Sequence, residues 1–523
     1  MTGSPESVKG GAVSCARRSC RTRSALLDCG AAPCSASLTF HLLVLALPSD
    51  DRLTPGERFA LELLVDLSAV LRCEGEGDVV RARVVGESRP PSSSELRTRN
   101  WGLDPIDGEV RVDRAVLRLV LDVAGAEVEQ RSTSADRFGR VPSGDTGAVR
   151  SSVDREPVVS LIARTLAASV REAAGRRPTR FVDPWPGGRR WAVSLTHDLD
   201  VVEWWPAFTS LRLVELLRNG EIARAARVAA AAVGSAGQPV VWRAVAELLA
   251  TEQRHAVRST WFVLCDRPTL ATMRAGDLTY RPDATGARRI LDAVRAAGHE
   301  IGLHGSFATS DDHARFGTQR SLLRSITGVQ PAGVRQHYLR MRAATTPRGM
   351  AAAGFEYDST YGFADRNGFR LGTADVLPLW DAEHEQPVGL DEVPFVWMDR
   401  ALSKYQHVET PRAWIDEALS LAERCRSVEG LWVGIWHPNL APALGFPDAP
   451  EAYAHLVAEL ARGDAYVAPL GELVTWRRAR RALRARLDAG GERVTLVGDD
   501  ASPPGAFTIR DADGRVDHGA LQR

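Results

Sequence analysis

The sequence predicts an α/β protein whose main domain is a (β/α) barrel of seven or eight parallel strands. Two observations predict this fold. Short apolar strand patterns alternate with helical patterns from about residue 189 to residue 487, and parallel neighbours need such crossover connections. Seven or eight such units in about 300 residues also match the size of a (β/α) barrel.

The elements of this barrel follow one another in order. Expected strands are Trp191–Thr196, Ser259–Leu264, Glu300–Leu303, Gly333–Arg335, Phe355–Tyr357, Glu392–Val396 and Leu431–Trp436, with Tyr466–Ala468 as an eighth. Expected helices are Gly286–Ala297, Ala314–Thr327, Pro347–Ala353, Pro411–Ser427, Pro450–Arg462 and Leu470–Leu487.

One connection in this barrel is oversized. Asp200–Ala256 holds two further helical stretches, Leu211–Val233 and Val241–Ala250, before the second strand. In a barrel this insertion would stand at the mouth, where it could act as a lid or as a wall that sets specificity.

The regions outside the barrel carry weaker patterns. We interpret residues 1–37 as a disordered leader, 38–175 as an accessory α/β domain, 176–188 as a linker and 488–523 as a short β tail. In the accessory domain, Glu57–Arg72 predicts a helix and Arg114–Leu121 alternates like a strand. No residue cluster in this domain indicates chemistry.

Composition excludes some classes of function. Lys+Arg and Asp+Glu both total 66 in 523 residues, so the whole surface is not expected to capture nucleic acid or an anionic membrane. No apolar run approaches the roughly 20 residues of a membrane helix. Seven cysteines, an odd number, argue against a disulfide framework and fit a reducing compartment. Without a clear export signal, we expect a cytoplasmic location.

Polar side chains gather where the predicted strands end. These residues are Asp198 and Asp200 after the first strand, His304 after the third, Arg335 and His337 after the fourth, and His437 after the seventh. Functional groups of a barrel lie at the carboxyl ends of its strands, so we expect these side chains to meet at one rim. Carboxylates near imidazoles suit a divalent ion with one position left for water.

These segments resemble the polysaccharide deacetylase (NodB-homology, carbohydrate esterase) superfamily over roughly residues 188–475. The resemblance is carried by Leu195-Thr196-His197-Asp198-Leu199-Asp200, Ser259-Thr260-Trp261-Phe262-Val263, Gly298-His299-Glu300-Ile301-Gly302-Leu303-His304, Arg335-Gln336-His337-Tyr338, Tyr357-Asp358-Ser359-Thr360 and His437-Pro438. It implies a distorted (β/α) barrel and a metal-dependent hydrolase that removes acetyl groups, from nitrogen or oxygen, of an acetylated glycan or sugar precursor.

The resemblance also implies a role for each residue. Asp198 matches the base that takes a proton from metal-bound water, and Arg335 matches the arginine that keeps this base ionised. Asp200 and His304 match metal ligands, and the metal is expected to be zinc. Tyr338 matches the position whose backbone N–H binds the developing oxyanion. His437 matches the general acid.

One departure affects the metal site. The family usually has a second metal histidine four residues after the first, but here that position is Ala308. We expect His337 to replace it, with Asp311 and His313 as alternatives closer in sequence. The departure keeps open a degenerate barrel that binds a glycan or a partner protein without turnover. A glycoside hydrolase fits less well, because Asp198 and Asp200 share one strand end.

For the other candidate residues, a structural role explains the sequence at least as well as a functional role. His299 opens its strand, so we expect it to lie far from the site. Asp358 and Ser359 either shape the rim or form a turn. Three tryptophans, Trp380, Trp397 and Trp436, either stack on a sugar or fill the barrel wall. The arginine run Arg477–Arg486 is expected to be a solvated helix face.

Overall fold

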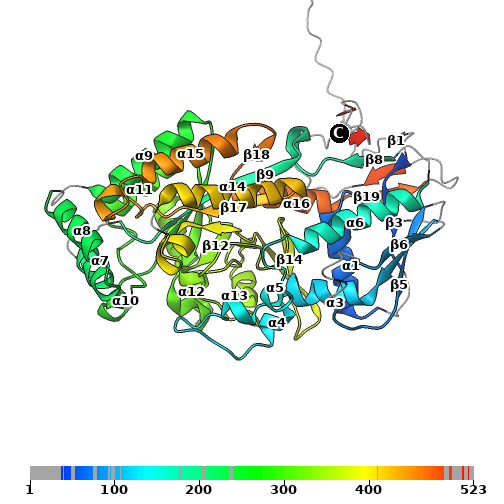
Figure 1. Ribbon diagram of the computed structural model, residues 1–523, viewed down its shortest axis with the longest axis horizontal. Coiled ribbons are helices and arrows are strands. Elements are labelled where there is room, and N and C mark those ends of the chain that lie inside the picture. Colours follow the sequence, from blue (N-terminus) through cyan, green and yellow to red (C-terminus); the bar gives the residue numbers. More distant parts are fainter. Residues whose placement is uncertain are drawn as a thin grey trace, which may run out of the picture. The chain divides into compact units, whose positions relative to one another are not determined.

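The computed structural model describes residues 37–38, 41–48, 53–74, 79–91, 95, 101–106, 108–175, 179–202, 207–234, 239–274, 276–408, 410–487, 494–497, 509–511 and 516–517 (Figure 1). The predicted leader, apart from residue 37, and most of the predicted tail lie outside these ranges, as do the first four cysteines of the chain.

The main sheet is built mostly of parallel strands, as predicted. Its parallel strands, in spatial order, are β15 (Gln386–Glu392), β13 (Tyr357–Asp358), β12 (Gly333–Gln336), β11 (Glu300–Gly305), β10 (Thr260–Leu264), β9 (Trp191–Leu199), β17 (Leu431–Ile435) and β16 (Trp397–Met398). β14 (Leu377–Asp381) pairs antiparallel with β15, and β18 (Ala465–Val467) pairs with the start of β9. All nine residues of β9 are buried, as expected for a parallel strand covered on both faces.

The sheet is not closed into a ring by a strand ladder between β16 and either β14 or β15 in the described ranges. The chain between β15 and β16 spans this gap instead. The backbone N–H of Val393 donates to the carbonyl of Asp358 in β13, and that of Val396 donates to the carbonyl of Val433 in β17 (both 2.9 Å). The strand predicted at Glu392–Val396 is therefore wrong, because this segment crosses from one side of the sheet to the other.

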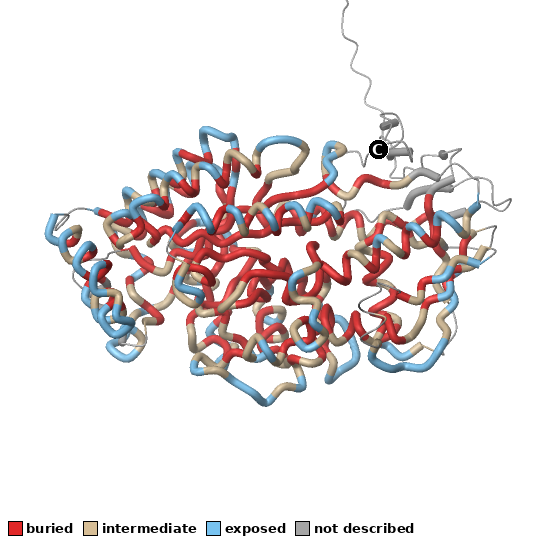
Figure 2. Tube along the Cα trace, in the orientation of Figure 1, coloured by how far each residue is buried: buried red, intermediate tan, exposed pale blue. Residues whose placement is uncertain are grey.

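Helices connect and cover the strands. They are α9 (Val240–Arg254), α11 (Thr285–Ala296), α12 (Ala314–Thr327), α13 (Thr346–Ala352), α14 (Pro411–Ser427), α15 (Ala449–Ala461) and α16 (Leu470–Ala482). α11 and α12 pack on β11, and α14 packs on β17. Figure 2 shows the strands buried while the covering helices alternate between buried and exposed faces. The predicted helices lie within a few residues of these bounds, except at the end of α16.

The insertion between β9 and β10 contains three helices. α7 (Ala207–Arg218) and α8 (Ile222–Gly234) precede α9. The single stretch predicted at Leu211–Val233 is divided at Gly220, whose φ of 75° is a backbone conformation that glycine adopts without steric cost. None of the helices in the described ranges is long and apolar enough to cross a membrane.

A second sheet joins the two ends of the chain. Its strands, in spatial order, are β1 (Ser37–Leu38), β20 (Val494–Val497), β19 (Arg484–Leu487), β4 (Leu71–Glu74), β3 (Val44–Ala46), β5 (Val80–Val85), β7 (Glu109–Asp113) and β6 (Leu103–Ile106). A small third sheet holds β2 (His41–Leu42), β8 (Thr179–Val182), β21 (Ile509–Asp511) and β22 (Val516–Asp517). The helix predicted at Leu470–Leu487 is therefore wrong at its end, where β19 pairs with β4.

Helices of the N-terminal region correct two further predictions. Arg114–Leu121, expected to be a strand, belongs to α3 (Arg114–Val123). The strand β7 ends at Asp113, whose carboxylate accepts a hydrogen bond from the Ala115 backbone (2.9 Å) and so caps the helix. The helix predicted at Glu57–Arg72 is α1 (Pro55–Leu67), and β4 begins after a short turn.

The arginine run of α16 is not a solvated face. Arg477 and Arg480 are buried. Arg477 pairs with Asp375 at 2.7 Å, and Arg480 donates to the backbone carbonyls of Asp66 (3.2 Å) and Ser68 (2.9 Å). The prediction failed because these side chains bind the C-terminal end of α1 and Asp375, which are distant in sequence.

Candidate metal centre

A pocket of about 320 Å³ opens at the carboxyl ends of the parallel strands of the main sheet. Its lining includes Asp198 from β9, Asp200 just after that strand, His304 from β11, His337 just after β12 and His437 two residues after β17. The polar residues predicted to meet at one rim are thus brought together, and Arg335 lies directly behind them.

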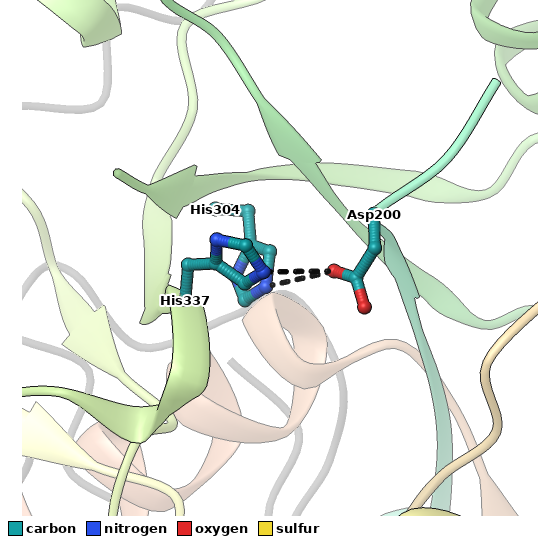
Figure 3. A group of neighbouring side chains, drawn as sticks. All are labelled: Asp200, His304 and His337. Atoms are coloured by element: carbon teal, nitrogen blue, oxygen red, sulfur yellow. Dashed lines mark ion pairs between the residues drawn. The ribbon is translucent and has the colours of Figure 1, made fainter. Parts of the chain in front are cut away.

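Asp200, His304 and His337, which all line this pocket, point toward one another (Figure 3). The carboxylate oxygen Oδ1 of Asp200 lies 3.4 Å from Nε2 of His304 and 3.7 Å from Nε2 of His337. One potential ligand atom from each of the three residues lies within 4.8 Å of the other two. The chain therefore gathers a carboxylate and two imidazoles around one point.

The other ring nitrogen of each histidine is already occupied. Nδ1 of His304 donates to the backbone carbonyl of Arg335 (2.9 Å), and Nδ1 of His337 donates to the carboxylate of Asp277 (3.0 Å). With the proton on Nδ1, the Nε2 lone pair of each ring points at Asp200. Such outer hydrogen bonds are the ones that orient metal-binding histidines.

These three residues fit a tetrahedral divalent ion. Bonds of about 2.0–2.1 Å at tetrahedral angles place ligand atoms about 3.3 Å apart, close to the separations from Asp200 Oδ1. This oxygen is buried and accepts no hydrogen bond within the described part of the chain, although buried carboxylate oxygens normally have a partner. A cation bound here would supply that partner.

The charges of the site favour a cation. Burial opposes the ionisation of Asp200, but interaction with His304 and the charges of His337 and His437 outweigh it and lower the pKa of this carboxyl. Burial likewise opposes the protonation of His304, yet the carboxylates of Asp198 and Asp200 raise its pKa. The site thus attracts positive charge.

Asp198 is held beside this centre by Arg335. Its Oδ1 accepts from Nη1 of Arg335 at 2.8 Å, and its Oδ2 lies 3.8 Å from Nε2 of His304. Burial favours the protonated carboxyl, but Arg335 in first place, then His304 and His437, lower the pKa of Asp198. Arg335 is itself fixed by Ser359, whose carbonyl and hydroxyl oxygens both accept from it (2.8 Å each). The surroundings therefore favour the ionised form of Asp198.

His437 lies beside both aspartates, with Nε2 4.0 Å from Asp198 Oδ2, and it has a carboxylate partner of its own. Its Nδ1 and its backbone N–H both donate to Asp399 (2.6 Å each), while its Nε2 faces the pocket, 3.7 Å from Asp200 Oδ2. Burial disfavours the charged imidazole, but Asp399 outweighs it, with help from Asp200 and Asp198, and raises the pKa of His437 to about 9. The surroundings therefore favour the protonated form of His437.

Tyr338 occupies a left-handed backbone conformation at the pocket wall, with φ of 58°. Such strain in a residue other than glycine costs about 1–3 kcal/mol and clusters at functional sites. The ring of Tyr338 stacks between His337 and Phe138, at 4.2 and 4.9 Å between centroids, and its carbonyl accepts from Arg140 (3.1 Å). The N-terminal region, from which no chemistry was expected, thus supports the site.

The alternative ligands lie elsewhere. Asp311 pairs with Arg340 and Arg342 (2.6 and 2.7 Å), and His313 precedes α12 against Phe316. Neither belongs to a group that could hold a metal within the described ranges. Of the two histidine substitutes in the sequence, only His337 lies beside Asp200 and His304.

The remaining candidates are structural. His299 joins a closed polar cluster behind the sheet, as expected. Asp358 is buried against Glu392, and burial together with this neighbour raises the pKa of Glu392 well above its ordinary value. The three tryptophans are buried and absent from the pocket wall; Trp380, for example, stacks on Phe59 at 4.8 Å.

Sequence reasoning missed two carboxylates of the site, Asp277 and Asp399. Asp399 directly follows β16, so a carboxylate at a strand end was the available signal, but that strand was not predicted. Asp277 lies in a loop before α11, and nothing in its sequence neighbourhood distinguishes it. Both act on histidines that are distant in sequence.

Comparisons with known proteins give distant matches. No protein-family model matches the chain, and no curated protein matches it. Among solved structures, one from Mycobacterium smegmatis, provisionally assigned as a polysaccharide deacetylase, is 23% identical with a TM-score of 0.39, over 57% of this chain and 94% of that chain. Puue allantoinase is 14% identical with a TM-score of 0.38, over 58% and 93%.

A third similar structure is the chitin deacetylase of Colletotrichum lindemuthianum, 14% identical with a TM-score of 0.30, over 56% of this chain and 89% of that chain. All three identities lie below 25% and all three TM-scores below 0.5. The activity of this chain must therefore be argued from its own residues and their geometry.

Proposed function

We propose that this protein is a metal-dependent hydrolase that removes acetyl groups from an acetylated carbohydrate. The observation that carries the proposal is the arrangement around Asp200, His304 and His337. A potential metal centre lies next to a carboxylate whose pKa is lowered, Asp198, and an imidazole whose pKa is raised, His437. Hydrolysis of an amide or ester needs a base for water and an acid for the leaving group.

Asp200, His304 and His337 would hold the ion, and two imidazoles with one carboxylate are a donor set that suits zinc. Bound there, a divalent ion supplies Lewis acidity, which polarises a carbonyl and lowers the pKa of water. The two histidines can bind without losing their orienting hydrogen bonds, because only Nε2 of each ring would be used.

The other residues divide the proton transfers. Asp198, kept ionised by Arg335, takes the proton from the attacking water. His437, kept protonated by Asp399, gives a proton to the departing nitrogen or oxygen of the sugar. The backbone N–H of Tyr338 stabilises the negative charge that develops on the acetyl carbonyl oxygen. A pocket of about 320 Å³ has the size of a small-molecule site.

The degenerate barrel without turnover loses its main support, which was the missing histidine. His337 lies where a third ligand is needed, and Asp198 and His437 are both present. A glycoside hydrolase is not favoured either, because Asp198 and Asp200 both approach Nε2 of His304 (3.8 and 3.4 Å) instead of flanking a substrate from two sides.

The experiment that tests the proposal measures acetate released from acetylated sugars and short glycans. We expect release by the purified protein, its loss after treatment with a chelator and its recovery when zinc is added back. The protein should remain folded throughout by circular dichroism. No acetate release from any acetylated sugar by zinc-loaded protein would contradict the proposal.

A further inference from the structure

The outer part of the pocket carries an excess of positive charge. Four cationic side chains line it, Arg140, Arg212, Arg400 and Lys404, together with one carboxylate that lies away from the metal centre, Glu215. Over the whole chain, by contrast, basic and acidic residues are equal in number. The excess is therefore local to this pocket.

These cations come from three separate parts of the chain. Arg140 belongs to the N-terminal region, and Arg212 to α7 of the insertion. Arg400 directly precedes η5 (Ala401–Tyr405), and Lys404 lies within it. This element is a single π-helical turn after β16. Turns of this kind are rare and frequently lie at functional sites.

Two of the four cations have carboxylate partners, and two do not. Arg212 pairs with Glu215, and Arg140 pairs with Asp136, each at 2.6 Å. Arg400 and Lys404 form no ion pair in the described part of the chain, although the charge of Glu215 attracts both. Four cations beside two carboxylates, Glu215 and Asp136, leave a net positive charge of about two.

The surroundings disfavour the charged forms of Lys404 and Arg212. Burial, in first place, and the charge of Arg400 lower the pKa of Lys404 to about 8, with Glu215 opposing. Burial and the charge of Arg400 also lower the pKa of Arg212. Holding like charges together in a half-buried wall costs free energy that a bound anion would offset.

We propose that the sugar taken by this pocket carries a phosphate group, which Arg400 and Lys404 bind directly while Arg212 and Arg140 add charge around it. The inference rests on the proposed function and names its substrate class. A phosphate ester brings a charge of about −1.5 to −2 near neutral pH, which matches the two unpaired cations. A carboxylate brings only one charge. Guanidinium and ammonium groups are the usual partners of phosphate.

Variants of the two unpaired cations test the inference by kinetics. We compare N-acetylglucosamine 1-phosphate with N-acetylglucosamine as substrates. In Arg400→Gln and Lys404→Gln, kcat/KM for the phosphorylated sugar should fall about 10- to 100-fold per variant, mostly through KM. Turnover of the neutral sugar should change little. Arg218→Gln is the matched control, because Arg218 is an exposed arginine at the end of α7, outside the pocket wall.

A binding measurement separates this inference from the deacetylase itself. Calorimetry follows N-acetylglucosamine 1-phosphate binding to zinc-loaded Asp198→Asn protein, with and without Arg400→Gln and Lys404→Gln. Loss of binding in the triple variant, at unchanged zinc content, supports the phosphate site even if no sugar is deacetylated. Unchanged binding overturns it, since the phosphate would then bind the metal. Tighter binding of an acetylated uronic acid also overturns it.

The phosphate has two potential sources, a soluble sugar phosphate and a lipid headgroup, and further binding measurements distinguish them. Helices beside the pocket expose apolar side chains, Leu217, Ile222 and Leu270, so a lipid-linked phosphate is tested beside a soluble one. Vesicles of phosphatidylcholine with phosphatidic acid are compared with phosphatidylcholine alone. Competition by UDP-N-acetylglucosamine indicates a soluble nucleotide sugar, and Lys404-dependent binding to the acidic vesicles indicates a lipid headgroup. Binding of both probes that is independent of Arg400 and Lys404 contradicts the inference.

Discussion

Two histidine–carboxylate clusters lie on opposite faces of one strand. His197 and Asp198 are neighbours in β9, and successive side chains of a strand point to opposite faces. Asp198 faces the pocket with Asp200, His304 and His337. His197 faces the other way, where its Nε2 contacts Glu252 at 3.0 Å, in a cluster closed by α9 and α15.

The two clusters differ in whether their carboxylate is satisfied. Glu252 contacts His197 and accepts from Tyr453 (2.6 Å) with one oxygen, and accepts from Ser259 (3.0 Å) with the other. Asp200 Oδ1 accepts from no group within the described ranges. The same residue types thus form a fully hydrogen-bonded structural network around Glu252, called the closed cluster below. Around Asp200 they form a site with an unsatisfied ligand atom, called the open cluster. An unpartnered buried atom, rather than composition, marks the candidate metal site.

The largest expected effect is on turnover. Asp198→Asn removes the base of the open cluster, and general-base catalysis contributes typically about 10²- to 10⁴-fold. We expect acetate release to fall by that factor while the circular dichroism spectrum stays that of the wild type. Undiminished turnover in this variant would show that another group takes the proton.

A stability effect should appear only in the closed cluster. Glu252→Ala removes the buried acceptor that His197, Tyr453 and Ser259 share. Each buried hydrogen bond that is not replaced costs about 1–3 kcal/mol, so the free energy of unfolding should fall by about 3 kcal/mol. Urea denaturation measures this loss. Glu247→Ala, at an exposed position of the same helix, should change it by less than about 0.5 kcal/mol. Equal effects of the two variants would mean that the closed cluster is not structural.

An intermediate effect is expected from the partner of the acid. Asp399→Asn removes the charge that keeps His437 protonated, so the pKa of His437 should fall from about 9. Outer-shell carboxylates of this kind typically change activity about 10- to 100-fold. The pH profile of kcat should lose its alkaline side first, because an acid is active only below its pKa. A profile of wild-type shape would assign Asp399 a purely structural role.

The smallest effect concerns the buried acid pair behind Arg335. Burial and Asp358 raise the pKa of Glu392, and burial raises that of Asp358 to about 6. The folded state therefore keeps a proton that the unfolded state releases above about pH 4.5, so this contribution to stability is present at low pH and is lost as pH rises through the folded pKa values.

Glu392→Gln has no such proton to lose. Between pH 5 and pH 8 its stability should decrease less than that of the wild type, by about 1–2 kcal/mol. Glu451→Gln, at an exposed position, serves as the control and should follow the wild type. If the free energy of unfolding changes with pH in the same way for Glu392→Gln and the wild type, the folded state does not keep a proton on the pair Asp358 and Glu392.

Much of the fold could be predicted from local pattern. The apolar strands of the main sheet and their crossover helices repeat at regular intervals, and the residues that end these strands, such as His304 and Arg335, were expected at the rim where they lie. The wrong predictions have two other causes. Arg114–Leu121 alternates in polarity, but a cap at Asp113 makes it a helix. The burial of the α16 arginines and the strand β19 depend on partners that are distant in sequence, namely Asp375, the end of α1 and β4.

The candidate site was predicted in its ionisable residues but not in its support. Asp200 and His304 carry motif signals, and His337 was preferred because it lies at a strand end. Asp277 and Arg140 carry no such signal, because their roles depend on the histidine or tyrosine that the fold brings to them. Asp399 follows a strand, but that strand was not predicted. The excess of positive charge in the pocket could not be predicted either, because basic and acidic residues are equal in number over the whole chain.

The most direct test of the account is the metal content of two matched histidine variants, measured by elemental analysis on purified, zinc-reconstituted protein. Asparagine can replace the Nδ1 contact of a histidine but not its Nε2 ligand atom. We predict about one zinc per chain for the wild type and for His299→Asn in the closed cluster, and far less than one for His337→Asn in the open cluster. Equal zinc in both variants, or none in the wild type, would contradict the metal centre.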